Sequence, residues 1–162
     1  MPFTPLHLGP GALFKAIGGR HFSFMVFGGA QVLMDIEPLL GILQDKPVLH
    51  GYTHSVAGAL LIGLAAAITG RPISAWVLRA SSYAQAAPSW RAAFSAALIG
   101  TYSHILFDAV MHADMNPWWP FGHGNGLLGL VPLGTLHLLC VGAGSLGLTV
   151  IAAQAWWRVP RK

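Results

Sequence analysis

Apolar residues gather along the chain into five segments, which we place at about residues 4–17, 22–43, 55–69, 92–111 and 127–153. The fifth segment is long enough to span a bilayer with some tilt. The first is short, and Gly9-Pro10-Gly11 interrupts it, which predicts a broken or re-entrant helix. Glycine and alanine recur in the segments, and small residues let helix backbones approach closely in lipid. The pattern predicts an all-α integral membrane bundle of four to five helices, with residues 1–162 forming one domain.

Charged side chains are scarce. Hydrophobic residues make up 54% of the chain and charged residues 9%, and the mean hydropathy is +0.60. A soluble domain carries roughly 25% charged residues, so this composition excludes an ordinary water-soluble domain and predicts membrane lipid as a partner. The nine basic residues lie singly or at segment ends, without a basic run that alternates with aromatic residues. This distribution argues against nucleic-acid binding.

The basic residues also predict an orientation. Residues 70–91 form the longest predicted connection and carry Arg71, Arg79 and Arg91. If this loop is cytoplasmic, eight of the nine basic residues lie on the cytoplasmic side, and only Lys46 lies outside. Five crossings would place the N-terminus outside and the C-terminus in the cytoplasm. If the first segment does not cross, the N-terminus also lies inside and the count does not change.

Ionisable residues in the apolar segments mark a candidate site. Four of the five acids lie in or at the edge of such a segment, where charge is costly and indicates function. The fourth segment carries His104, Asp108 and His112 at positions i, i+4 and i+8, which places them on one helical face. This stripe is about 12 Å long, too long for one ion with bonds of about 2 Å. It therefore predicts either two ions or one ion with supporting partners.

Other ligand-type residues are predicted to reach the same outer layer of the membrane. His50 and His54 form an i, i+4 pair just before the third segment, and Asp35 and Glu37 precede Pro38, which we expect to stop the second helix. The predicted divalent-metal ligands are therefore His7, Asp35, Glu37, His50, His54, His104, Asp108 and His112. Histidine and carboxylate ligands without thiolate favour Zn²⁺, with Mn²⁺, Fe²⁺ or Ni²⁺ as alternatives. The remaining histidines are expected to pack or to lie in a loop: His21, His123 and His137.

At these residues the chain resembles the bacterial membrane-bound metal-dependent hydrolases, small inner-membrane proteins that include a LexA-regulated member. The resemblance covers residues 1–121 and rests on four elements: His7, Asp35-Ile-Glu37, His50-Gly-Tyr-Thr-His54-Ser55, and Ser103-His104-Ile-Leu-Phe-Asp108 followed by Pro117-Trp-Trp-Pro120. Three features depart from the family pattern: Met34 replaces a proline, Glu37 replaces an aspartate, and the glycine directly follows His50. The resemblance implies a bacterial inner-membrane location.

The predicted function is metal-dependent hydrolysis of a phosphoester or lipid-like substrate near the outer face. A bound metal would activate the attacking water. Glu37 is a candidate general base, and Asp114 is a candidate for protonating the leaving group. Intramembrane Asp and His chains also build proton relays, so a proton- or ion-coupled transporter is the alternative. A third interpretation is a structural or assembly protein that retains a metal site. The substrate and the oligomeric state stay open.

Overall fold

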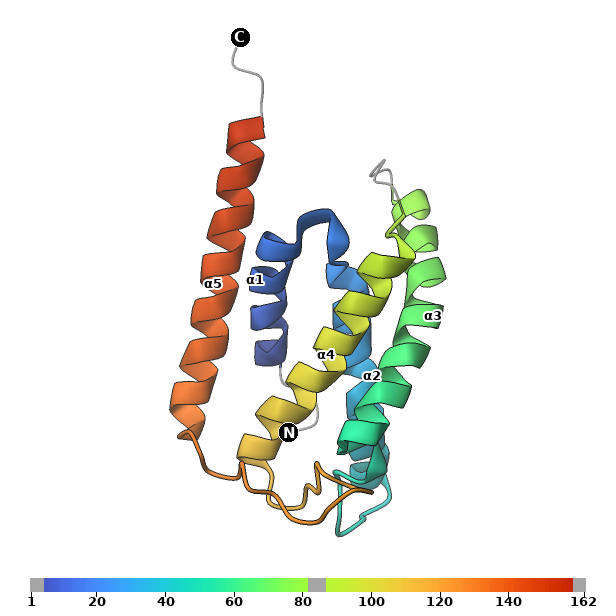
Figure 1. Cartoon of the computed structure of the whole chain (residues 1–162), viewed down its shortest axis with the longest axis vertical. Helices are drawn as coiled ribbons and strands as arrows, with labels where there is room; N and C mark the ends of the chain where they lie inside the picture. Colours follow the sequence, from blue (N-terminus) through green and yellow to red (C-terminus); the bar gives the residue numbers. More distant parts are fainter. Residues whose placement is uncertain (1–4, 82–86, 159–162) are drawn as a thin grey trace.

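The chain folds into helices joined by loops and short 3₁₀ turns, and no strand occurs in the residues that the structure describes (Figure 1). The computed structural model describes residues 5–81 and 87–158. The α-helices are α1 (Gly9–Gly18), α2 (Phe24–Leu43), α3 (Val56–Ala80), α4 (Trp90–Met111) and α5 (Leu133–Arg158). The predicted all-α fold is confirmed. Residue 4, the predicted start of the first segment, and the basic residues Arg161 and Lys162 lie outside the described residues.

Four helices, α2 to α5, are long and apolar enough to cross a membrane. The chain is therefore a membrane protein with four candidate spans in the described residues. Helix α1 has ten residues, a length of about 15 Å, and cannot cross the roughly 30 Å hydrocarbon core. The predicted topology in which the first segment also crosses the membrane, giving five crossings, is therefore wrong. Gly9-Pro10-Gly11 begins α1 rather than breaking it, because proline is tolerated in the first helical turn, where its missing N–H has no partner to lose.

Pro38 was expected to end a helix and does not, and Pro72 also lies inside a helix. Helix α2 continues through Pro38, and α3 continues through Pro72 to Ala80, well past the predicted end at residue 69. Each proline removes one backbone hydrogen bond, which neighbouring helices and side chains can compensate in a membrane helix. Arg71 consequently lies in α3 instead of a loop, with its guanidinium 4.5 Å from the centre of the Trp90 ring. Helix α5 begins later than predicted, at residue 133 instead of 127.

Small residues allow the helices to pack closely, as the sequence predicted. Alanines of α2, α3 and α4 meet around Phe22 and Phe27 in the main core. Helix α1 packs lengthwise against α5 (Figure 1). A Cβ atom on Gly147 would lie 2.3 Å from the backbone nitrogen of Leu13. Only glycine therefore permits this approach of α5 to α1.

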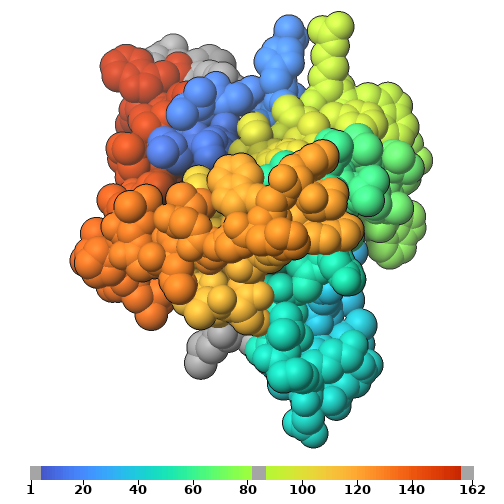
Figure 2. Space-filling model, turned by 60° about the horizontal axis from the view of Figure 1, so that its bottom comes forward, coloured from blue at the N-terminus to red at the C-terminus, as the bar shows by residue number. Residues whose placement is uncertain are grey.

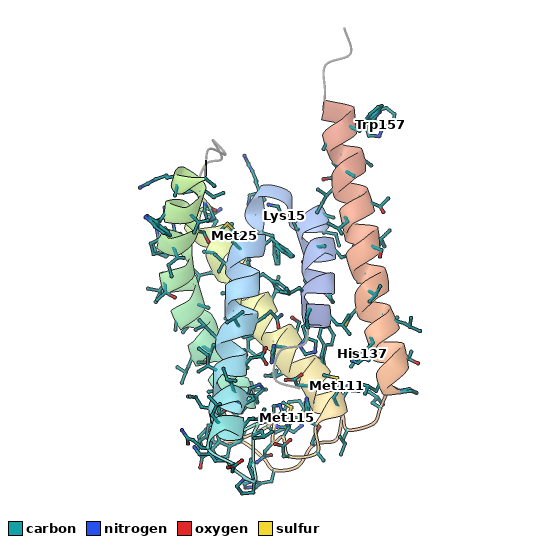
Figure 3. All side chains as sticks on the ribbon, turned by 180° about the vertical axis from the view of Figure 1, so that it is seen from behind. Lys15, Met25, Met111, Met115, His137 and Trp157 are labelled. Atoms are coloured by element: carbon teal, nitrogen blue, oxygen red, sulfur yellow. The ribbon has the colours of Figure 1, made fainter. Side chains whose placement is uncertain are left out.

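The two ends of the bundle differ in chemistry. Loops 44–55 and 112–132 share one end, which we call the carboxylate end (Figure 1). Figure 2 shows this face, with residues 112–132 extending across it and residues 44–55 projecting at one side. The opposite end, the basic end, is formed by the α1–α2 turn and the first turns of α2 and α4. Figure 3 shows Lys15 near the basic end and Met111 and Met115 near the carboxylate end.

Candidate metal centre

The carboxylate of Asp108 lies at the centre of a buried cluster of histidines. Helix α4 presents His104 one turn before Asp108, and His104 Nε2 lies 3.1 Å from Asp108 Oδ2. The Nε2 atoms of His7 and His54 each lie 3.6 Å from a carboxylate oxygen of Asp108, and that of His50 lies 4.0 Å away. Asp108 is only 3% exposed. Four imidazoles from separate parts of the sequence therefore converge on one buried carboxylate.

Short 3₁₀ turns deliver two of these histidines. His7 lies in the turn Pro5–Leu8 directly before α1, and His54 ends the turn Tyr52–His54 directly before α3. The Ser55 side chain caps α3 by accepting a hydrogen bond from the Gly58 N–H at 3.0 Å, and its hydroxyl donates to the Tyr52 carbonyl at 2.7 Å. The cap therefore fixes the turn at the helix start and directs His54 into the bundle.

The ligand-type atoms form two groups, each with atoms within 4.8 Å of one another. The first, the buried group, contains Asp35, His54, His104 and Asp108. The second, the open group, contains His50, Asp108 and His112. Asp108 belongs to both groups. The stripe along α4 is thereby divided between them. Whether it holds two ions, or one ion with supporting partners, stays a prediction.

Several nitrogens of the cluster lack a hydrogen-bond partner. These buried atoms are both ring nitrogens of His7 and the Nε2 atoms of His54 and His104. The Nε2 atoms lie close to Asp108 but make no well-aligned hydrogen bond with it. Leaving such a group unpaired costs about 1–3 kcal/mol, so these nitrogens could serve as ligands of a metal ion. Nitrogen and carboxylate donors without sulfur fit a divalent ion such as Zn²⁺, Mn²⁺ or Fe²⁺. The residues present therefore fit a metal.

The opposite nitrogen of His104 is held by Gln31, a residue that sequence reasoning missed. The Gln31 side-chain NH₂ donates to the Gly100 carbonyl at 3.2 Å, which leaves its oxygen to accept from His104 Nδ1 at 2.6 Å. A neutral His104 then carries its proton on Nδ1 and directs an unprotonated Nε2 toward Asp35 and Asp108. Metal ligands are commonly oriented in this way. The available signal was the i, i+4 spacing of Gln31 and Asp35 on one face of an apolar segment.

Glu37 and Asp114 lie beside the Nδ1 atoms of two other histidines, opposite the Nε2 atoms that face Asp108. Glu37 accepts hydrogen bonds from the backbone N–H and the hydroxyl of Thr53. The Thr53 hydroxyl oxygen in turn lies 3.0 Å from His54 Nδ1, and Glu37 Oε2 lies 3.6 Å from the same nitrogen. Asp114 Oδ1 lies 2.9 Å from His50 Nδ1, and Asp114 Oδ2 accepts from the N–H groups of Leu49 and His50. Partial burial opposes ionisation, but the hydrogen bonds from His50 and Leu49 hold the pKa of Asp114 at about 2. Asp114 is therefore a carboxylate that orients His50.

Burial keeps the flanking histidines neutral. Desolvation lowers the pKa of His7 to about 4, against the attraction of Asp108. Desolvation, together with the neighbouring His112 and His54, also lowers the pKa of His50. A neutral imidazole is the form that binds a metal. The electrostatics of the site therefore agree with its geometry.

The structure thus separates the predicted site residues by position. Asp35, His50, His54, His104, Asp108 and His112 supply the two ligand groups, and His7 borders them. Glu37 was predicted as a ligand, and both Glu37 and Asp114 as catalytic groups. Their carboxylates lie behind His54 and His50 and outside both ligand groups. A catalytic role for either stays a prediction.

A pocket borders two residues of the open group, His50 and His112. It has a volume of about 320 Å³ and is lined by His50, His112 and Asp114 together with apolar residues of α2 and the following loop. The His112 ring stacks on the His50 ring with a centroid distance of 4.0 Å. His54 and His104 are fully buried and do not line the pocket. The open group therefore faces this cavity through His50 and His112, whereas no residue of the buried group lines it.

The remaining histidines lie outside both ligand groups. His21 is exposed at the basic end, where it accepts a hydrogen bond from Arg20 rather than packing in the core. His123 lies 3.4 Å from the Asn116 side chain in the loop across the carboxylate end. His137 is half-buried on α5, close enough to lower the pKa of His7 through its charge. It therefore lies nearer the cluster than its apolar sequence neighbours suggested.

The chain matches no protein-family model, no curated protein and no solved structure. The resemblance of its motifs to the membrane-bound hydrolases therefore stays a prediction. Ligand atoms converge on Asp108, and buried nitrogens beside it lack a hydrogen bond, so the cluster could hold a metal ion.

Proposed function

We propose that the chain is a membrane-embedded, metal-dependent hydrolase whose substrate enters at the carboxylate end. One observation carries the proposal: Asp108 is shared by a buried ligand group and by a group that faces a pocket. A structural metal site has all its positions filled by protein, whereas a catalytic site keeps a position open. The open group contributes only three residues, so an ion held there retains room for water and substrate.

The chain's own residues provide a rigid support for this chemistry. His50 and His112 face the pocket, and Asp114 fixes the ring of His50 through its Nδ1 atom. The side chain of Asn125 donates to the carbonyls of Ala109 and His112, which holds the end of α4 in place. A divalent ion bound by the open group would lower the pKa of a water to about 7 and polarise the bond to be cleaved.

The pocket walls favour a substrate with an apolar portion. Pro38, Ile42, Pro47 and Leu49 line it, and no lysine or arginine is among its lining residues. A free phosphate dianion would therefore find no side-chain cation in the pocket. A lipid-like ester or a phosphodiester, with an apolar substituent against these walls, fits better.

The metal and the location are part of the same proposal. Zn²⁺ suits the histidine and carboxylate donors, and two ions correspond to the two ligand groups. The motif resemblance supports a bacterial inner membrane. Basic residues at the basic end, such as Arg20, Arg79 and Arg91, support a cytoplasmic location for that end and for the C-terminus of α5.

Ion-coupled transport has less support. A transport pathway needs polar groups through the whole thickness of the membrane. The core of α2, α3 and α4 toward the basic end contains alanines and packed rings such as Phe22 and Phe27, with Ser74 as a buried polar residue on α3. An ion that reached Asp108 from the carboxylate end would meet this apolar layer. The geometry therefore favours a site open to one side.

A hydrolysis screen of the purified full chain tests the proposal. The protein, stripped with a chelator and reloaded with Zn²⁺ or Mn²⁺, is offered chromogenic phosphodiester, phosphomonoester and carboxylic ester substrates. We expect metal-dependent turnover that His112→Ala abolishes and that His123→Ala, the same change in a loop outside both groups, leaves intact. If the metal-loaded protein hydrolyses none of these substrates faster than Asp108→Ala does, the hydrolase proposal is wrong.

A further inference from the structure

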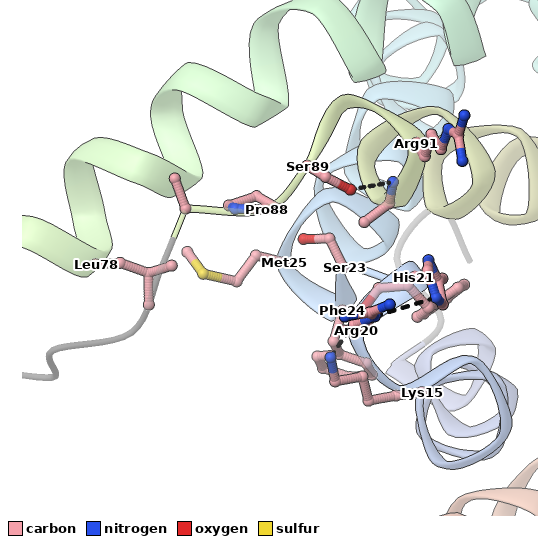
Figure 4. Close-up of a pocket in the computed structure, with 13 residues that line it drawn as sticks. Lys15, Arg20, His21, Ser23, Phe24, Met25, Leu78, Pro88, Ser89 and Arg91 are labelled. Carbon is pink, nitrogen blue, oxygen red and sulfur yellow. Dashed lines mark hydrogen bonds between the residues drawn. The ribbon is translucent and has the colours of Figure 1, made fainter.

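A second and larger pocket lies at the basic end, on the opposite side of the bundle from Asp108 (Figure 4). Its volume is about 650 Å³, and it lies between the α1–α2 turn and the first turn of α4. Lys15, Arg20 and Arg91 are among its lining residues. The metal centre uses none of them. The pocket is therefore a separate feature with its own chemistry.

The positive charge of this pocket is not neutralised by the protein. No aspartate or glutamate is among the lining residues. All five acids of the chain lie in the second half of α2, in the second half of α4 or in the loops of the carboxylate end. The ion pairs among the described residues join histidines to carboxylates and involve no lysine or arginine. The acidic residues of the described chain therefore supply no counter-ion to this pocket.

Two helix N-termini add to the positive potential. Ser23 caps α2 by accepting from the Val26 N–H, and Ser89 caps α4 by accepting from the Ala92 N–H. Both serines line the pocket. Each cap satisfies one backbone donor, and further N–H groups of each first turn have no partner within the helix. Such groups favour phosphate, and here they accompany the cationic side chains.

The walls of the pocket are fastened to one another. The Ser23 N–H donates to the Ala92 carbonyl at 3.3 Å, and the Ser95 hydroxyl donates to the His21 carbonyl at 2.7 Å. The Lys15 ammonium donates to two carbonyls of the α1–α2 turn, at 2.8 and 2.9 Å. An ammonium has three N–H donors, so one remains for a ligand. The site is held in position before any ligand arrives, which lowers the cost of binding.

The pocket is apolar on one side. Figure 4 shows Met25 and Leu78 on one side and Lys15, Arg20 and His21 on the other. Phe24 and Met25 begin the apolar span α2, and both are exposed. A ligand with a phosphate at one end and hydrocarbon at the other can therefore contact both sides.

We propose that this pocket binds the phosphate headgroup of an anionic phospholipid. The cations and the helix N-termini hold the phosphate, and the acyl chains pass beside Met25 and Leu78 into the bilayer. Basic pockets between membrane helices bind acidic headgroups in this way. A free phosphate compound offers the same anion without the hydrocarbon, so the test separates the two sources.

Native mass spectrometry of the full chain released from nanodiscs provides the test. The nanodiscs contain phosphatidylcholine with or without phosphatidylglycerol. We expect wild type to retain phosphatidylglycerol selectively and Arg20→Gln/Arg91→Gln to lose it. One basic residue near an anionic headgroup contributes roughly a factor of five in affinity, so the double change should weaken binding by roughly 25-fold. Lys15 is left unchanged because its ammonium also holds the backbone of the turn.

Arg79→Gln is the matched control, because Arg79 is an exposed basic residue in the last turn of α3 and does not line the pocket. It should retain the lipid as wild type does, and Arg20→Lys/Arg91→Lys should retain most of it. If Arg79→Gln weakens phosphatidylglycerol binding as much as the double variant does, the lipid is held by general electrostatic attraction to the basic end and not by this pocket, and the proposal is wrong. If inorganic phosphate or glycerol phosphate displaces the lipid at comparable concentration, the lipid assignment is overturned.

Discussion

Replacing Gln31 with leucine tests whether an unpredicted residue supports the metal centre. Gln31 is buried, and its oxygen accepts from His104 Nδ1 at 2.6 Å, while its NH₂ group is engaged by Gly100. Leucine is similar in size but cannot accept a hydrogen bond. The His104 ring would lose the hydrogen bond between its Nδ1 atom and Gln31, and with it the constraint that directs Nε2 toward Asp108.

The size of the effect follows from burial. Loss of a partner that orients a metal-ligating histidine typically weakens metal binding 10- to 100-fold, about 1.4 to 2.7 kcal/mol. Because His104 is fully buried, water cannot replace the missing acceptor, and an unpaired buried donor costs about 1–3 kcal/mol. We therefore expect Gln31→Leu to weaken Zn²⁺ binding toward 100-fold. Gln31→Glu, which keeps an acceptor, should recover most of the affinity.

Competition with a chromogenic chelator measures the Zn²⁺ dissociation constant of each purified variant. Gln154→Leu is the matched control, since Gln154 is exposed on α5 and donates only to the Ala16 carbonyl, away from the centre. It should bind Zn²⁺ as wild type does. If the two leucine variants bind Zn²⁺ equally well, Gln31 does not orient His104 and the reasoning is refuted.

Two further predictions concern the other support residues and the helix packing. Glu37→Gln should weaken Zn²⁺ binding about tenfold in the same competition assay, because it removes the charge beside His54, a proposed ligand. Asp45→Asn changes an exposed loop acid and should leave the affinity unchanged. An equal effect of both variants would contradict this role of Glu37. Gly147→Ala should lower the stability of the solubilised protein by about 1–3 kcal/mol in thermal unfolding, because its Cβ would meet the α1 backbone. Gly142→Ala has open space at its Cβ and should be neutral, and equal melting of the two variants would argue against close packing of α1 on α5.

Hydropathy predicted the fold class because lipid imposes a simple rule on the backbone. Segments without charge must form helices to satisfy their own hydrogen bonds, so the cores of α2 to α5 were found. Their ends were less predictable. Pro38 and Pro72 look like helix stops in a soluble protein, yet both lie inside helices here. The Gly9-Pro10-Gly11 sequence looked like an interruption and is instead a helix start.

The candidate site was partly predictable for a related reason. The i, i+4 and i+8 spacing assigns His104, Asp108 and His112 to one face of a helix. The helical rise per residue gives the depth of each ligand-type residue in the membrane, so distant segments could be expected to bring these residues to one layer. Spacing does not show which nitrogen of a ring faces the centre or what holds the other one. Gln31 and the positions of Glu37 and Asp114 behind their histidines needed coordinates, because they depend on side-chain directions between helices.

The central claim is that Asp108 is shared by two metal-binding groups. The most direct test is the metal content of purified full-length protein, measured by inductively coupled plasma mass spectrometry after loading with Zn²⁺ and removal of free metal. We predict one ion for each of the two ligand groups in wild type, loss of one ion in His112→Ala, and loss of stoichiometric metal in Asp108→Ala. A wild-type protein without stoichiometric metal, or an Asp108→Ala variant with wild-type content, would contradict the account.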